Sequence, residues 1–247
     1  MTFKVTQITD THLSFDHPER TADLRACIDA INKREVPDIV IHTGDVTHNG
    51  LPDEYALAKE ILSSLPCPVY AIPGNRDNRE NFRQCFTSDG YLESDDKFLQ
   101  YSISTPHHHL LFLDTLCETS NKGQLCSARL EQFRSMLSHC SGGDKSKRII
   151  VVMHHSPFEA TEIPDPRQFV DWPDVTAFGK VVVEYPVIER IICGHVHRNI
   201  ESVLETEGAS HPVPVHALTC LAGDLRKGKV SDEERKQPVF REFLLNQ

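Results

Sequence analysis

Short apolar, β-branched runs alternate along the chain with segments whose apolar residues recur at helical spacing. A strand buried on both faces appears as a continuous apolar run, whereas an amphipathic helix repeats its apolar positions every three to four residues. The alternation is typical of β-α units around a buried sheet, so we expect an α/β fold. The runs predict strands at Phe3–Ile8, Ile39–Ile41, Val69–Ile72, Leu110–Leu113, Ile149–Met153, Arg190–Cys193 and Val213–Leu221.

Helical spacing predicts helices around Leu24–Ile31, around Tyr55–Leu65 and, after a candidate cap at Ser127, around Leu130–Leu137. No repeat or low-complexity linker interrupts the chain, so we expect one domain over residues 1–247. The densely charged stretch Asp224–Gln237 predicts a solvated loop.

The segment 156–184 departs from this pattern. It holds four prolines and the only tryptophan, Trp172, and it has no clear period before Val175. We interpret it as a long loop that caps a substrate site, followed by a short helix. Trp172 or Phe158 could stack on a base there, or could pack as core.

Composition narrows the class of protein. The net charge of −10 disfavours a binder of nucleic-acid polymers, because phosphate backbones require clustered Lys and Arg. The densest apolar run, Ile149–Met153, is far shorter than the ~18 residues of a membrane helix, and residues 1–7 contain no apolar signal core. The 8 cysteines include no C-x-x-C pair, which is typical of free thiols in a reducing compartment. We therefore expect a cytoplasmic protein without membrane partners.

Polar residues follow strand after strand of the predicted sheet. Ligands of open α/β sheets gather outside the carboxyl ends of the strands, so these residues are expected to converge in space. Any one of the motifs could be ordinary turn chemistry, but their order, each after a predicted strand, indicates a functional site. The motifs are Asp10-Thr11-His12, Gly44-Asp45, Gly74-Asn75-Arg76-Asp77, His154-His155 and Gly194-His195-Val196-His197.

The ordered motifs resemble those of the calcineurin-like metallophosphoesterases, whose signature is D-x-H, G-D, G-N-H-[D/E], H and G-H-x-H. The match runs from Asp10 to His197, and the compact length and spacing are most similar to the class III cyclic nucleotide phosphodiesterases. The resemblance implies a four-layer α/β/β/α sandwich of two mixed β-sheets flanked by helices.

The resemblance also implies two metal ions bridged by Asp45. The first would be bound by Asp10, His12, Asp45 and His197, and the second by Asp45, Asn75, His154 and His195. Mixed oxygen and nitrogen donors suit Mn, Fe or Zn. Catalytic roles fall to Asn75, Arg76 and Asp77, and substrate contacts to Asn75, Arg76 and His195.

The charges support this assignment. Two divalent ions, two carboxylates and one bridging hydroxide sum to +1, which would attract an anionic phosphoester into an otherwise acidic protein. We infer that this hydroxide is the nucleophile, because a metal pair lowers the pKa of bound water toward ~7. No serine or cysteine nucleophile is then required.

Arg76 departs from the signature, which has histidine there to protonate the leaving oxygen. Arginine stays charged but can clamp a phosphate. Two alternatives remain open: Arg76 stabilises charge in the pocket, or it points to solvent. Among other histidines, His48 and His17 could reach the edge of the pocket, and His155 is expected to be structural. The run His107–His109 is expected to form a solvated turn.

The leading hypothesis is a dinuclear-metal phosphodiesterase that hydrolyses cyclic nucleotides, 3′,5′ or 2′,3′ cyclic AMP or GMP. A phosphomonoesterase or nucleotidase on the same centre is the first alternative, and a catalytically silent metal-binding scaffold is the second. In the first two cases the partner is a small phosphoester, with a nucleotide favoured. Relatives often dimerise, so a homodimer stays open.

Overall fold

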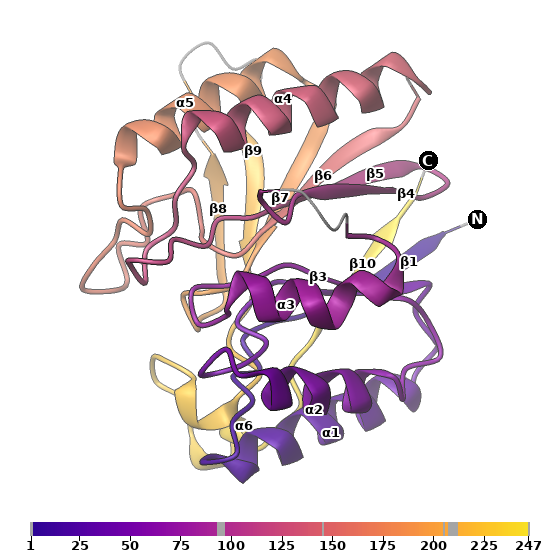
Figure 1. Ribbon diagram of the computed structural model, residues 1–247, viewed down its shortest axis with the longest axis vertical. Coiled ribbons are helices and arrows are strands. Elements are labelled where there is room, and N and C mark those ends of the chain that lie inside the picture. The colour runs from indigo at the N-terminus through magenta and orange to yellow at the C-terminus, as the bar shows by residue number, and fades with distance from the viewer. Residues whose placement is uncertain (1, 93–96, 145, 205, 207–211, 247) are drawn as a thin grey trace.

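The strands of the chain form two mixed sheets (Figure 1). The computed structural model describes residues 2–92, 97–144, 146–204, 206 and 212–246. In the first sheet, parallel strands β1, β2 and β3 are joined at one edge by antiparallel β10, in the order β10-β1-β2-β3. These strands are β1 (Phe3–Ile8), β2 (Ile39–His42), β3 (Val69–Ala71) and β10 (Arg241–Leu245).

The second sheet has the order β4-β5-β6-β7-β9-β8, with antiparallel strands at both edges of a parallel centre. Its strands are β4 (Tyr101–Ser104), β5 (His108–Leu113), β6 (Arg148–Met153), β7 (Ile188–Cys193), β8 (Ile200–Leu204) and β9 (Val213–Ala217).

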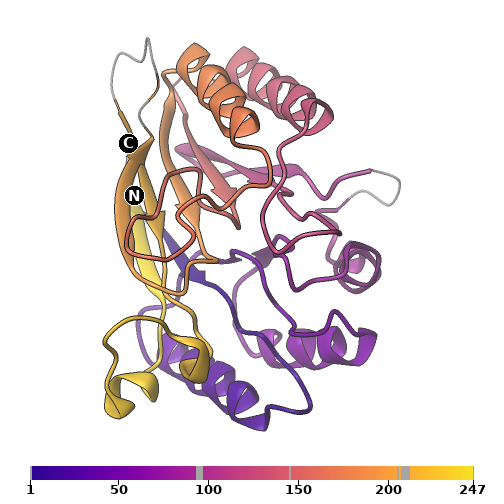
Figure 2. The ribbon, with the colours of Figure 1, turned by 90° about the vertical axis from the view of Figure 1, so that its left-hand side faces the viewer.

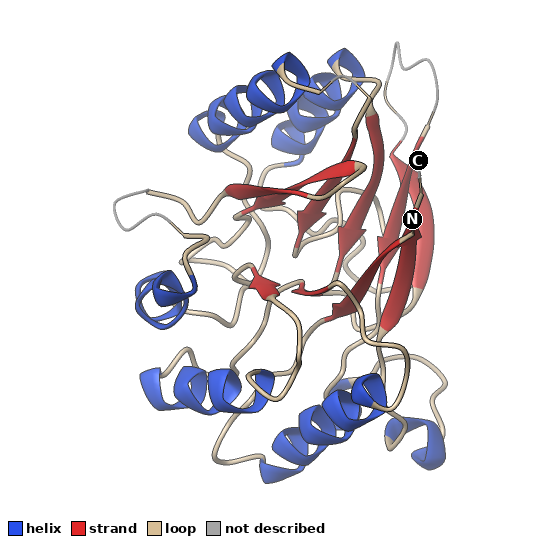
Figure 3. Cartoon of the chain, turned by 90° about the vertical axis from the view of Figure 1, so that its right-hand side faces the viewer, coloured by secondary structure: helices blue, strands red, loops and turns tan. Residues whose placement is uncertain are grey.

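Helices cover the outer faces of both sheets, which confirms the expected four-layer architecture (Figures 1 and 3). The first sheet carries α1 (Pro18–Asn32), α2 (Pro52–Leu62) and α3 (Arg79–Phe86), and the second carries α4 (Ser127–Gly142) and α5 (Trp172–Glu184). Short turns of helix complete the described part: η1 (Thr87–Asp89), η2 (Gly223–Leu225) and α6 (Asp232–Arg235). None of the described helices is long and apolar enough to cross a membrane.

Strand β6 shows why the sequence contains continuous apolar runs. Ile150 and Val152 point into the core between the two sheets, whereas Ile149 and Val151 pack under α4 and α5. Both faces of the strand are therefore buried, and no polar alternation remains. Within each sheet the parallel strands run in the same direction (Figure 2), and residues that follow strands of both sheets come together at one edge of the sandwich, which we call the seam.

The short helix expected after the cap segment is present as α5, which begins at Trp172 because Pro173 suits the first helical turn. Two other local predictions were wrong. The run His107–His109 is no solvated turn, because His108 opens β5, is buried and lies 3.0 Å from the carboxylate of Glu189.

The stretch Asp224–Gln237 is likewise more than a solvated loop. It includes most of η2 and all of α6, and Arg226 within it is buried. The guanidinium of Arg226 donates to the carbonyl oxygens of Cys220, Leu221 and Gln237, which anchors this segment beside the first turn after β9.

Candidate metal centre

The carboxyl ends of β1, β2, β3, β6 and β7 bring the predicted ligands together at the seam. Ligand atoms of Asp10, His12, Asp45 and His197 all lie within 4.8 Å of one another. The carboxylates of Asp10 and Asp45 are fully buried or nearly so, at 0% and 1% exposure. Residues from both ends of the chain thus form one compact polar cluster.

The backbone at this cluster is strained. Within the described residues, every non-glycine residue with positive φ belongs to the predicted ligand set. Such a conformation costs an ordinary L-residue roughly 1–2 kcal/mol, less for Asp, and concentrates at functional sites. The φ angles are 52° at Asp10, 45° at His12, 52° at Asp45, 71° at His195 and 53° at His197.

Asp45 lies between two groups of donors. Its Oδ2 is 3.4 Å from Nε2 of His12, and its Oδ1 is 3.6 Å from Nε2 of His154. The backbone N–H of Arg76 donates to the same Oδ1 at 2.7 Å. One carboxylate oxygen therefore faces each group, the arrangement expected of a bridging ligand.

Around the first position, a buried atom has no hydrogen-bond partner. Oδ2 of Asp10 accepts from Thr9 Oγ1 and from the backbone N–H of His195, but Oδ1 accepts nothing. That oxygen faces Nε2 of His197 at 3.2 Å, while Nδ1 of His197 donates to the carbonyl oxygen of Leu225. An unsatisfied buried carboxylate oxygen beside imidazole nitrogens fits a cation between them.

The second position fits a cation by a similar argument. Gln168 Nε2 donates to the carbonyl oxygen of Asp165, which turns Oε1 toward His195, and His195 Nε2 donates to it at 2.9 Å. The other nitrogen, Nδ1, then directs a lone pair at Oδ1 of Asn75, 2.9 Å away. His154 Nε2 lies 3.2 Å from the same oxygen, and its Nδ1 donates to a backbone carbonyl. His195 Nδ1 and Asn75 Oδ1 are thus two acceptors that face one another, which fits a cation between them.

In the metal-free protein, the pKa values of the clustered residues depend on the same close contacts. Burial raises the pKa of Asp45, but His154 and His12 outweigh it and hold this pKa at about 2. Burial lowers the pKa of His154, yet Asp45 and Asp10 raise it to about 9. Burial lowers the pKa of His195 to about 3, so this ring is neutral. Protons on His154 therefore compensate the carboxylates where cations would otherwise do so, and metal binding must displace them.

Arg76 lies in the wall of the cavity rather than in free solvent. Its Nη2 donates to Nε2 of His48 at 3.0 Å. Burial, and to a lesser extent the positive charge of Arg76, lowers the pKa of His48 to about 4. The imidazole is therefore neutral and accepts this bond. His48 also packs edge-on against the ring of His12. The guanidinium is thereby held beside the cluster.

Asp77 turns away from the predicted ligands. Its carboxylate accepts from the backbone N–H groups of Val46, Thr47 and Gly74 and from the hydroxyl of Tyr55. These bonds tie the loop after β2 to the loop after β3. The geometry favours a positioning role for Asp77 over the catalytic role that the resemblance implies.

A cavity of about 410 Å³ opens over the cluster. The cap segment contributes Ile163, Pro164 and Gln168 to the wall of this cavity. Phe158 is buried, and Trp172 packs against the apolar core between the second sheet and helices α4 and α5. Neither aromatic residue lines the cavity. His48 reaches the wall, but His17 does not, and its ring lies 2.9 Å from Glu19 instead.

Sequence reasoning missed two supporting residues. Gln168 orients His195, and Cys220 Sγ donates to the backbone carbonyl of Asp10. The buried ring of His155 lies 4.3 Å from that of His195. His155 is structural, as expected, since its Nδ1 is bonded to Thr115 Oγ1. Gln168 and Cys220 lie in segments without a motif, so no sequence signal pointed to them.

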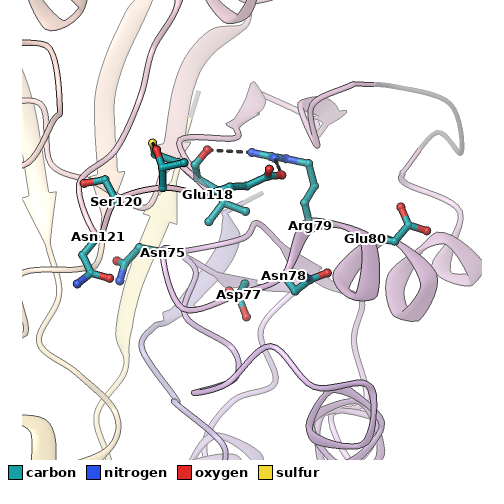
Figure 4. A pocket seen from close by; sticks show the side chains of 11 residues that line it. Asn75, Asp77, Asn78, Arg79, Glu80, Glu118, Ser120 and Asn121 are labelled. Atoms are coloured by element: carbon teal, nitrogen blue, oxygen red, sulfur yellow. Dashed lines mark hydrogen bonds and ion pairs between the residues drawn. The ribbon is translucent and has the colours of Figure 1, made fainter.

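A second hollow, of about 520 Å³, adjoins this cavity and shares Asn75 and Asn121 with it (Figure 4). Glu80, Asn78 and Glu118 line it, and its cation Arg79 is paired with Asp114 and Glu118. The cavity over the cluster is therefore flanked on this side by a polar wall whose arginine is already paired.

Comparisons with known proteins agree with this architecture. Residues 3–199 match the family model described as calcineurin-like phosphoesterase. The chain is 30% identical over 237 residues to a probable glycerophosphodiester phosphodiesterase GpdQ from Arcobacter nitrofigilis, covering 90% of this chain and 81% of that protein. It is 26% identical over 228 residues to a probable cyclic nucleotide phosphodiesterase from Coxiella burnetii, covering 90% and 87%.

Solved structures support the fold. A dimetal phosphatase from Danio rerio superposes with a TM-score of 0.70 at 15% identity, covering 89% of this chain and 88% of the other. At that identity the likeness concerns the arrangement of sheets and helices, which agrees with the four layers described above.

Proposed function

Because the chain belongs to the calcineurin-like phosphoesterases, a family of hydrolytic enzymes with a dinuclear metal centre, we propose that it is a metal-dependent phosphodiesterase. Its proposed substrates are small phosphodiesters, with cyclic nucleotides among them, because relatives are named as phosphodiesterases of both glycerophosphodiesters and cyclic nucleotides. The cavity over the cluster has room for a ligand of that size.

One observation carries the proposal. The left-handed conformations of the described chain, glycines apart, all fall on candidate ligands that surround two buried carboxylates. A silent scaffold would have no reason to maintain such strain, whereas ligand binding offsets it. Strain and buried charge together therefore favour a working centre over the scaffold alternative.

The roles of the residues follow from their positions. Asp10, His12, Asp45 and His197 would hold one ion, and Asp45, Asn75, His154 and His195 the other. Mn, Fe and Zn suit this donor set. Such ions, when bound, supply Lewis acidity and lower the pKa of water.

Arg76 is proposed to stabilise the negative charge of the phosphoryl group. Its guanidinium, fixed by His48, presents its remaining N–H donors to the cavity, where an arginine can bind two phosphate oxygens. Neither Arg76 nor the neutral His48 can give up a proton at neutral pH, so the leaving oxygen takes its proton from water or from another histidine.

Arg76→His tests this role. The variant is expected to gain, or to shift, a basic limb in the pH–rate profile, because histidine can act as a general acid and arginine cannot. A profile of the same shape as that of the parent protein would argue against Arg76 as the residue that replaces the usual acid.

The function itself is tested with protein stripped by chelator and reloaded with Mn, Fe or Zn. We expect turnover of bis(p-nitrophenyl) phosphate and of cyclic nucleotides only after reloading, with less on p-nitrophenyl phosphate. Asp45→Asn should lose this turnover, because Asp45 faces both donor groups. Asp53→Asn, at an exposed position of α2, is the matched control and should keep it. Turnover of p-nitrophenyl phosphate alone would favour the monoesterase alternative, which Arg76 could serve by binding a dianion. No turnover with any metal and substrate would favour the scaffold.

A further inference from the structure

The substrate cavity is positively charged on one side, although the protein has a net charge of −10. Arg76, Arg198 and Lys227 all line it, and the one carboxylate in its lining is the candidate ligand Asp45. Within the described residues, no carboxylate lies within 4.0 Å of the charged nitrogens of Arg198 or Lys227. Two neighbouring cations without counter-charges attract an anion from solution.

Arg198 lacks a polar partner as well. Its Nε is buried but has no hydrogen bond within the part of the chain that the structure describes. The guanidinium lies against the backbone of Gly228, where a Cβ atom would come within 3.2 Å of Nη1. Glycine at this position, with φ of +94°, thus leaves space for the arginine.

The backbone places both residues beside the metal cluster, since Arg198 directly follows His197 in the chain. The backbone N–H of Lys227 donates to the carbonyl oxygen of His197 at 3.1 Å, and Nδ1 of His197 donates to Leu225. Arg198 and Lys227 therefore flank a candidate metal ligand on one side. Glu162 and Glu234 lie in an adjoining cavity that both cations also reach, beyond ion-pair distance from either.

We propose that Arg198 and Lys227 form a subsite for a second anionic group of the substrate, a phosphate or a carboxylate, next to the phosphodiester that is cleaved. The inference rests on the proposed phosphodiesterase function and refines its substrate class. A nucleotide diester with an additional phosphate fits this subsite better than a diester with a single charge. The adjoining hollow, which shares Asn75 and Asn121 with the cavity, offers no such group, because its cation Arg79 is already paired (Figure 4).

A matched pair of substrates tests the subsite. Thymidine 5′-(p-nitrophenyl phosphate) and its 3′-phosphorylated form release the same p-nitrophenol and differ only in the second anion. We expect the metal-loaded protein to prefer the 3′-phosphorylated form in kcat/KM. Arg198→Gln and Lys227→Gln should each lower that preference about tenfold, and 0.5 M NaCl should lower it in the parent protein, since the side chains are partly exposed.

Two exposed residues serve as controls. Arg148 lies at the amino end of β6, the end away from His154, and Lys229 is close to Lys227 in sequence but does not line the cavity. Arg148→Gln and Lys229→Gln should therefore both keep the preference of the parent protein. Equal losses on both substrates in the Arg198 variant would place Arg198 on the cleaved phosphate and overturn the subsite. An unchanged preference in both subsite variants would overturn it as well.

Calorimetry separates this inference from the proposed function. If the loaded protein turns over neither substrate, the phosphodiesterase proposal fails, but thymidine 3′,5′-bisphosphate should still bind about tenfold more tightly than thymidine 5′-phosphate. Arg198→Gln should abolish that difference. Equal affinities of the parent protein for the two nucleotides would overturn the subsite whatever the outcome of the activity assay.

Discussion

Replacing Asp77 by Asn should destabilise the protein without touching any candidate metal ligand directly. Oδ1 of Asp77 accepts from the backbone N–H of Thr47 at 3.1 Å and from the hydroxyl of Tyr55 at 2.9 Å. Oδ2 accepts from the N–H groups of Val46 at 3.1 Å and Gly74 at 2.8 Å. An amide has the same shape, but its NH₂ group must face at least one of these donors.

The expected loss of unfolding free energy follows from whichever of the two orientations of the asparagine amide costs less. With its NH₂ group toward the hydroxyl, Asn leaves the N–H of Thr47 without an acceptor, which costs about 1–3 kcal/mol in a buried site. The remaining bonds lose their charge assistance, so we estimate a total of about 2–5 kcal/mol. For a chain of this size each kcal/mol corresponds to about 2–4 °C, so Tm should fall by at least about 4 °C.

The assay is thermal unfolding of the metal-free protein by circular dichroism, which removes any contribution of bound ions. Metal affinity should also fall, because the loops that bear Asp45 and Asn75 are no longer tied together. Asp53→Asn, exposed in the first turn of α2, should change Tm by less than about 2 °C. If Asp77→Asn lost activity while Tm and metal affinity stayed at parent values, Asp77 would be catalytic and the positioning role would be wrong.

Three further predictions concern other features. Asp45→Asn should lose most metal at both positions, because one carboxylate faces both donor groups, and elemental analysis giving two ions per chain would contradict this. In metal-free protein, His12→Gly should be more stable to thermal unfolding than His12→Ala by about 1 kcal/mol, because φ at this position is 45°. At Lys180, on the exposed face of α5, the alanine variant should instead be the more stable of the two. Iodoacetamide should alkylate Cys126 first: burial raises the pKa of this thiol, but the backbone N–H and guanidinium of Arg129 outweigh it and lower the pKa. Burial raises the pKa of Cys27 to about 12, and a peptide map with Cys27 labelled as early as Cys126 would refute the ranking.

The sequence revealed the central strands because burial on both faces leaves a continuous apolar run, and β1 was predicted residue for residue. Edge strands carry a weaker signal. In β10, Phe243 is buried between exposed neighbours, and in β8 only Ile200 and Leu204 are buried, so neither strand presents an apolar run. Helix α3 was missed for a related reason, since it buries little apolar surface beyond Phe82 and Phe86.

The candidate site was predictable as a set of residues but not as a geometry. Motif order placed Asp10, Asp45 and His197 near one another, as the structure does, because strand ends converge whatever lies between them. The left-handed backbone at these residues could not be foreseen, since no glycine marks it. Partners distant in sequence, such as Gln168 for His195, depend on how the loops pack, and residue spacing carries no trace of that.

The order in which the ligands occur along the chain has a consequence for biosynthesis. Asp10 and Asp45 emerge early from the ribosome, but His197 comes much later, and its imidazole is oriented by Leu225, which follows later still. A nascent polypeptide thus exposes its carboxylates long before the imidazoles that complete the centre exist. Stable loading with both proposed ions is therefore expected only after translation has passed Leu225.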